Sequence, residues 1–188
     1  VAKMIVDDLN CEFSLGQDIW TGIDYIGEPT PYHTKNSYFG TVDTAGFAKD
    51  AFWVFKSGWD HDAAPFVHIY PYWDFNEGQV VDVRACTNGC AVELFVNGVS
   101  KGKQKIVHAR GKNVQATWQV AYTTGEITAV AYDESGAEIA RETRYSFGDG
   151  VKLTLTSNKN VLRADGEDLV FVEIGVLDAE NHPVENAM

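Results

Sequence analysis

From Phe66 onward, apolar and polar residues alternate in short runs, the spacing that places every second side chain of a strand on the same face. Gly-containing pairs that favour tight hairpin turns separate several of these runs, as at Asn97-Gly98 and Ser135-Gly136. The pattern predicts strands at 66–70, 79–85, 91–96, 115–122, 126–132 and 138–145. So many short strands with apolar rows facing each other are typical of an antiparallel β-sandwich, and the chain is therefore predicted to be mainly β.

The first sixty residues have a different pattern. Residues 13–20 predict a buried strand, 23–31 a loop rich in Gly and Pro, and 45–57 a helix that Thr44 caps and Gly58 ends. One face of that helix would hold Phe47, Ala51, Val54 and Phe55. One strand and one helix cannot bury their own apolar faces, so this segment is expected to pack on a larger body.

After Gly150 a second β pattern begins, with strands predicted at 152–156 and 169–177. Two or three strands do not make a stable sandwich. Residues 149–188 are therefore expected to be the start of a further, incomplete sandwich domain. The chain divides on this basis into segments 1–62, 63–148 and 149–188.

Composition excludes some partners. The formal net charge of -12 and the sequence pI near 4.7 oppose binding to nucleic acid or to an anionic membrane, because phosphate groups are held chiefly by clustered Lys and Arg. No apolar run approaches the length of a membrane span, and residues 1–20 lack the pattern of a signal peptide. A neutral ligand such as a sugar remains compatible with this charge.

The three cysteines predict neither a disulfide framework nor a metal site. Cys86 and Cys90 are close together, Cys11 is remote, and no neighbouring Cys or His pair completes a zinc tetrahedron. The spacing leaves open a local bond between Cys86 and Cys90 across a hairpin. We expect no metal and no cofactor.

The most informative stretch is WTGIDYIGEPTPY at 20–32, followed by NSYFGTVDTAGF at 36–47. It resembles bacterial family 2 glycoside hydrolases of the β-galactosidase type, in which such a run ends the eighth strand of a (β/α)8 barrel and leads into the last helix. Residues 92–98 and 125–132 resemble the immunoglobulin-like domain that follows that barrel, and residues 162–166 resemble the start of another. The resemblance implies that 1–62 close the barrel and 63–148 form the immunoglobulin-like sandwich.

The resemblance also implies a sugar site, because active sites of this fold gather at the carboxyl ends of the barrel strands. The indole of Trp20 would pack on the C–H face of a pyranose, and Asp24 and Tyr25 would bind its hydroxyls. A Trp at the end of a strand is also an ordinary core residue, and this alternative stays open. Partners expected on this basis are a β-galactoside and the remainder of the barrel.

No catalytic residue is expected in this chain. A retaining glycosidase needs two carboxyl groups about 5 Å apart, and Asp18, Asp24 and Glu28 invite that role. The family takes its two catalytic glutamates from barrel strands four and seven, which precede Val1, so Glu28 is interpreted as a turn or hydrogen-bonding residue. The chain alone is expected to be inactive, within a parent that hydrolyses terminal β-galactosides with retention of configuration.

Two other functions stay open, a noncatalytic carbohydrate-binding module and a structural spacer. A binding module predicts a coplanar aromatic pair on a sandwich face, whereas the barrel interpretation predicts an exposed Trp20. Aromatic residues at the entrance to the sandwich, Trp59, Tyr70, Tyr72 and Trp73, suit either a platform or domain packing. The histidines are scattered and form no evident triad. The sequence gives no compartment, and the resemblance is compatible with a periplasmic or extracellular location.

Overall fold

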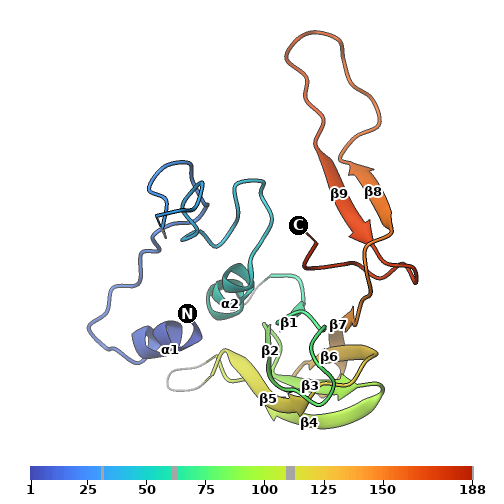
Figure 1. Cartoon of the computed structure of the whole chain (residues 1–188). Coiled ribbons are helices and arrows are strands. Elements are labelled where there is room, and N and C mark those ends of the chain that lie inside the picture. Colours follow the sequence, from blue (N-terminus) through green and yellow to red (C-terminus); the bar gives the residue numbers. More distant parts are fainter. Residues whose placement is uncertain (31, 61–62, 109–112, 188) are drawn as a thin grey trace.

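The computed structural model describes residues 1–30, 32–60, 63–108 and 113–187, and the fold is mainly β with antiparallel strand pairing in its three sheets. Figure 1 shows two helices on one side of a sandwich and a separate hairpin beyond it. Two residues that the sequence analysis considers lie outside the described residues: Pro31 of the predicted loop, and His61 among the histidines.

Two sheets make the sandwich. The first has the order β1-β2-β5, formed by β1 (Val67–Tyr70), β2 (Val80–Thr87) and β5 (Gln115–Ala121). The second has the order β4-β3-β6-β7, formed by β4 (Val99–Lys105), β3 (Ala91–Val96), β6 (Glu126–Tyr132) and β7 (Glu138–Tyr145). The predicted antiparallel sandwich is therefore confirmed, and β4 is a strand that the sequence pattern did not predict.

Alternate residues of the two sheets meet in one core. Val83 of β2 and Trp118 of β5 are buried from one side, and Leu94 of β3 and Ile127 of β6 from the other. Trp73 is fully buried among them. Each strand thus turns one face inward, as the period-two pattern requires.

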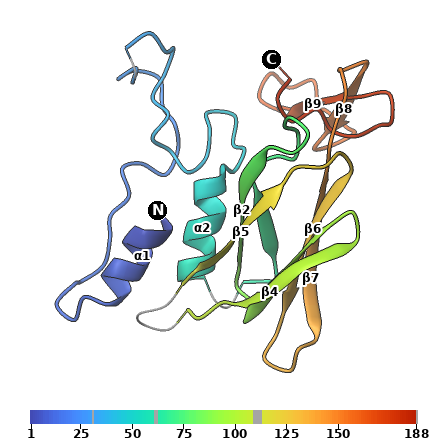
Figure 2. The same cartoon turned by 60° about the horizontal axis from the view of Figure 1, so that its bottom comes forward.

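Helices α1 (Ala2–Leu9) and α2 (Asp50–Trp59) lie side by side next to the first sheet (Figures 1 and 2). Ile5 of α1 and Val54 and Phe55 of α2 form a second buried cluster with Phe66 and residues of the first sheet. The segment therefore packs on the sandwich through its helices.

The predicted helix at 45–57 is misplaced by a few residues. Asp43 accepts the backbone N–H groups of Ala45 and Phe47, both at 2.9 Å, and Gly46 has a positive φ of 98°. This turn competes with helix formation, so Thr44 is not the cap and α2 starts at Asp50. Gly58 does not end α2 either. A Cβ there would lie 2.8 Å from the Ile5 side chain, so the glycine permits close contact between the helices.

The predicted buried strand at 13–20 is wrong for this structure. That segment is irregular, and Phe13 and Leu15 are 90% and 106% exposed. A strand needs a hydrogen-bonded neighbour and a covering layer, and no described segment pairs with this one. Helix α1, in contrast, was not predicted from the sequence.

A charged network joins α2 to the sandwich. His68 of β1 lies between Asp50 of α2, at 3.0 Å from its Nε2, and Glu142 of β7, at 3.5 Å from its Nδ1. Burial by itself would lower the pKa of His68, but the hydrogen bonds to the two carboxylates outweigh it and raise the pKa. Arg144 then connects Glu142, at 3.2 Å, to Glu185 near the C-terminus, at 2.6 Å. Ion pairs thus connect helix α2, the sandwich and the C-terminal segment to one another.

The last hairpin, β8 (Lys152–Ser157) and β9 (Val172–Leu177), stands apart from the sandwich in Figure 1. Its register pairs Leu155 with Ile174, which places both side chains on the same face, and they are 70% and 66% exposed. The hairpin therefore carries an apolar face that no other described residue covers. The three cysteines are free thiols, so the local disulfide left open by the sequence is absent.

Candidate functional site

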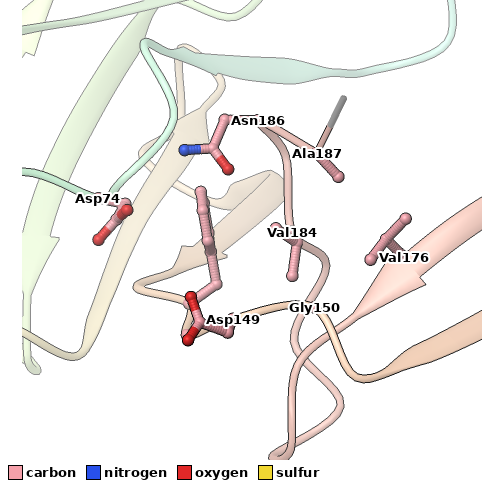
Figure 3. Close-up of a pocket in the computed structure, with 9 residues that line it drawn as sticks. Asp74, Asp149, Gly150, Val176, Val184, Asn186 and Ala187 are labelled. Carbon is pink, nitrogen blue, oxygen red and sulfur yellow. The ribbon is translucent and has the colours of Figure 1, made fainter.

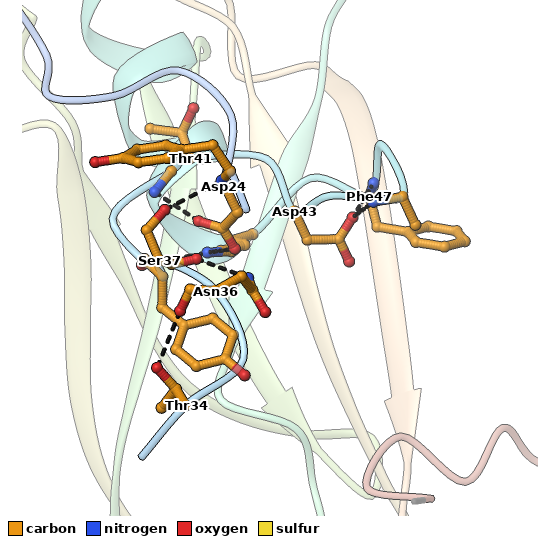
Figure 4. Close-up of polar contacts among 12 residues, drawn as sticks. Asp24, Thr34, Asn36, Ser37, Thr41, Asp43 and Phe47 are labelled. Atoms are coloured by element: carbon orange, nitrogen blue, oxygen red, sulfur yellow. Dashed lines mark hydrogen bonds and ion pairs between the residues drawn. The ribbon is translucent and has the colours of Figure 1, made fainter. Parts of the chain in front are cut away.

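The candidate site is a loop in which the chain folds back on itself between Trp20 and α2. Ile23 bridges to Val42, and the backbone N–H of Thr41 donates to the carbonyl of Gly22 at 3.0 Å. Residues 20–27 and 36–42 therefore run side by side, as Figure 4 shows from their polar contacts. Two arms held by backbone hydrogen bonds give the side chains at their ends fixed positions.

Asp24 is at the centre of this loop and is 4% exposed. One carboxylate oxygen accepts the backbone N–H of Gly40 at 2.7 Å, and the other pairs with Lys49 Nζ at 2.6 Å. A Cβ at position 40 would lie 2.3 Å from the Asp24 nitrogen, so only Gly fits there. Asp24 therefore ties both arms of the loop to the residue that precedes α2.

Ser37 is fully buried and connects the segment 36–42 to the backbone of Tyr25. Its Oγ accepts the backbone N–H of Tyr25 at 3.1 Å, and its own N–H donates to the Tyr25 carbonyl at 3.0 Å. Nearby, the hydroxyl of Thr34 donates to the carbonyl of Asn36 at 3.0 Å (Figure 4). These contacts fix the backbone on which the Tyr25 side chain stands.

Trp20 projects from the loop with 74% of its surface exposed. Its indole N–H donates to the hydroxyl of Tyr25 at 3.3 Å, and that hydroxyl donates to the carboxylate of Glu28. The hydrogen bond to the Glu28 carboxylate raises the pKa of Tyr25 above its ordinary value. The three side chains form a chain of donors and acceptors that orients an exposed indole.

A hollow of about 560 Å³ opens beside this chain. It is lined by Trp20, Glu28, Pro29, Thr30, Tyr32 and Phe39. Aromatic walls with one carboxylate suit a ligand that has an apolar face and hydroxyl groups. None of these described lining residues is a Lys or Arg, so nothing in this wall would neutralise an anionic ligand.

The structure brings two of the three predicted substrate-binding residues together. Trp20 lines the hollow and Tyr25 is its hydrogen-bonded neighbour, whereas Asp24 is buried and both its oxygens are bonded within the loop. Sequence reasoning missed Lys49 and Gly40, which hold Asp24. No local signal marks that pair, because its contacts form only when the loop folds.

Other kinds of site have little support. Among the residues that the structure describes, no group of three or more His, Cys, Asp or Glu could hold a metal ion. No helix in the described part of the chain is long and apolar enough to cross a membrane. His33, which is near this loop in the sequence, is exposed.

One family model matches residues 78–140, described as a domain of unknown function, DUF4982. This match covers most of the sandwich and none of the Trp20 loop.

Two longer proteins match more of the chain. A β-galactosidase of Bacteroides ovatus, BoGH2A, is 39% identical over 184 residues, which are 96% of this chain and 20% of that protein. A putative β-glucuronidase of Formosa agariphila is 32% identical over 174 residues, which are 87% of this chain and 16% of that protein. The chain thus spans about a fifth of the length of these relatives.

Solved structures agree with the fold. A β-glycosidase from Bacteroides vulgatus superimposes with a TM-score of 0.77 at 30% identity, covering 86% of this chain and 20% of that one. A glycosyl hydrolase family 2 member from Bacteroides cellulosilyticus gives a TM-score of 0.73 at 26% identity, covering 87% of this chain and 26% of that one.

Proposed function

Because this chain is homologous over most of its length to a segment of the family 2 glycoside hydrolases, we propose that it serves in a longer enzyme that hydrolyses terminal β-galactosides with retention. In this proposal residues 1–62 close the catalytic barrel, 63–148 form the immunoglobulin-like sandwich, and 149–188 begin a further sandwich. The enzyme acts on a carbohydrate, and this part of it supplies binding surface and support.

The exposed indole of Trp20 is the observation that carries the proposal. An indole with 74% of its surface in solvent gains little stabilisation from burial, and its face is accessible to a ligand. It is oriented by Tyr25 and Glu28, and the loop beneath it is fixed by the buried Asp24. A rigid aromatic face on a supported loop is what stacking on a pyranose requires.

Charge favours a galactoside over a glucuronide. The hollow beside Trp20 presents the Glu28 carboxylate and no described Lys or Arg in its lining. A glucuronide carries a carboxylate that would need a cationic partner there, because an unpaired anion near a like charge is repelled. We expect the longer enzyme to prefer p-nitrophenyl β-galactoside over the β-glucuronide by at least tenfold in kcat/KM. The opposite preference would contradict the proposed β-galactoside substrate, but not the homology to family 2 glycoside hydrolases.

The 188-residue chain by itself should not turn over any chromogenic glycoside. Retaining hydrolysis needs both an acid/base and a nucleophilic carboxylate, and we place both outside this chain. Asp24, the buried carboxylate, is already bonded to Gly40 and Lys49. Measurable turnover by the purified chain, lost on Glu28→Gln, would overturn this part of the proposal.

The decisive test is Trp20→Ala in the longer enzyme. Loss of the platform should lower kcat/KM by at least tenfold, about 1.4 kcal/mol, with little change in melting temperature. Trp53→Ala is the matched control, because Trp53 stacks on His68 at 5.2 Å and contacts Phe66, so its loss should lower stability first. If Trp20→Ala destabilises the protein and leaves its kinetics unchanged, Trp20 is a core residue and the platform assignment fails.

A further inference from the structure

A second hollow, of about 630 Å³, lies between the sandwich and the C-terminal hairpin and shares no lining residue with the hollow beside Trp20. Its walls come from the loop between β1 and β2, from the link between β7 and β8, from Val176 of β9, and from the last residues described. Figure 3 shows Asp74, Asp149 and Asn186 from three of these segments around one opening. The volume is within the range of about 300–1,000 Å³ that small-molecule sites occupy.

One wall of this hollow is aromatic. Phe147 lines it, and its ring lies 6.1 Å from that of Tyr72, which is 37% exposed. Tyr72 in turn stacks on Phe75 with the ring planes 4° apart. The cluster continues inward to the fully buried Trp73. Aromatic side chains thus extend from the core to the surface, and Phe147 is the ring among them that lines the hollow.

Hydrogen bonds hold the residues directly before and after Phe147 in the chain, Ser146 and Gly148. The Oγ of Ser146 accepts the hydroxyl of Tyr122 at 2.7 Å, and the Ser146 N–H donates to the carbonyl of Gly125 at 2.8 Å. On the other side, the N–H of Gly148 donates to Asp178 at 2.9 Å. The ring is therefore held before any ligand arrives, which lowers the entropic cost of binding.

The polar side chains at the hollow have unused hydrogen-bonding capacity. Asp74, Asp149 and Asn186 make no side-chain hydrogen bond or ion pair with any residue that the structure describes. Asp178 nearby is different, because its carboxylate accepts three backbone N–H groups. Two free carboxylates and one amide offer acceptors and donors beside an aromatic ring, the combination that binds neighbouring hydroxyl groups of a sugar.

We propose that this hollow binds a neutral pyranose, with one sugar face on Phe147 and hydroxyl groups on Asp74, Asp149 and Asn186. The ligand is neutral because the two carboxylates repel a uronic acid and no described lining residue is a Lys or Arg. The site is open and small, so single sugars should bind in the millimolar range. This inference does not depend on the enzyme activity proposed above, since the binding belongs to this chain.

The test is a titration of the ¹⁵N-labelled 188-residue chain with methyl β-galactopyranoside, followed by amide chemical shifts. We expect saturable shifts at Gly148, Asp149 and Gly150. The double variant Asp149→Ala/Asn186→Ala should weaken the apparent Kd at least tenfold, and both residues are exposed, so the fold is retained. Phe147→Ala should abolish binding. Phe171→Ala removes a 69% exposed aromatic residue elsewhere and should leave the Kd unchanged.

Two parallel titrations make the result specific. Glucuronic acid should bind at least tenfold more weakly than the neutral galactoside. Calcium chloride should give no saturable shift at these amides. The proposal is overturned if no sugar produces saturable shifts, if the shifts gather only around Trp20, or if calcium alone saturates the site.

Discussion

The sandwich and the segment before it bury their apolar residues to very different degrees. In the sandwich, Trp73, Leu94 and Ile127 are fully buried between two sheets. In the first sixty residues, Phe13 and Leu15 are almost fully in solvent, although the helices of the same segment are packed. Both regions are rich in apolar residues, so composition does not account for the contrast. What differs is whether a described segment of the chain packs against these side chains.

The comparison predicts the largest loss of stability in the sandwich core. Trp73→Ala removes a fully buried indole whose ring lies 5.0 Å from Tyr122, and should cost about 3–5 kcal/mol in chemical denaturation. Trp59→Ala, at a position 47% exposed, is the control and should cost much less. A loss below about 1 kcal/mol for Trp73→Ala would contradict the closed core.

The next effect should be confined to the Trp20 loop. Gly40→Ala places a methyl group 2.3 Å from the Asp24 nitrogen and should destabilise the loop by about 1–3 kcal/mol. Amide hydrogen exchange should rise across residues 20–49 and stay unchanged in β3 and β6. Gly22→Ala is the matched control, because a Cβ there meets nothing within 4 Å. Equal exchange in the two variants would show that Asp24 does not hold the loop.

The junction between the two regions should depend on pH through His68. Its raised pKa means that the folded state binds the proton more tightly than the unfolded chain. This stabilisation is fully present below the unfolded pKa of about 6.5, and is lost as pH rises through the folded pKa. The free energy of unfolding of the wild type, relative to His68→Gln, should therefore fall between pH 6 and pH 9. A difference that is flat or rises over this interval would exclude the charged junction.

Protonation of Glu142 should end the stabilisation by the same charged network at low pH. Burial would raise its pKa, but the hydrogen bond to His68 and the charge of Arg144 outweigh burial and lower it. A lowered carboxyl pKa gives stabilisation that is present above the unfolded value and lost as pH falls through the folded one. The junction should therefore be strongest between these two limits, near pH 5–6.

The smallest effect should come from the exposed apolar residues. Phe13→Ser and Leu15→Ser remove side chains that contact little else, and each should change the free energy of unfolding of this chain by less than about 0.5 kcal/mol. A loss above about 1 kcal/mol would show that these side chains are buried in solution, which would remove the contrast between the two regions.

The sequence predicts the sandwich better than the segment before it, and the reason is physical. The strands at Ala91–Val96, Glu126–Tyr132 and Glu138–Tyr145 agree with the pattern residue for residue, because alternation and a nearby turn encode them locally. The predicted strand at 13–20 rests on apolar content alone, and apolar content does not supply a partner. Strand β4 was missed because its lysines hide the alternation, and α1 because eight residues give a weak periodic signal.

The sequence likewise predicts some residues of the candidate site and misses the contacts that hold them. Trp20 and Tyr25 are named through the family resemblance, and the structure places them as hydrogen-bonded neighbours. The contact of Asp24 with Gly40 and Lys49 joins residues far apart in sequence, and spacing cannot show it. The second hollow is still harder to predict, because its polar walls come from three separate segments.

The lysines of β4 have a consequence for the behaviour of the protein at high concentration. Strand β4 is the last strand on one side of its sheet, with backbone groups that another chain could pair with. Lys101, Lys103 and Lys105 lie along it, and the register against β3 shifts between Glu93 and Phe95. Positive charges that repel their own copies and an uneven edge both oppose strand addition between molecules. This border of the sheet is thereby protected against growth into fibrils.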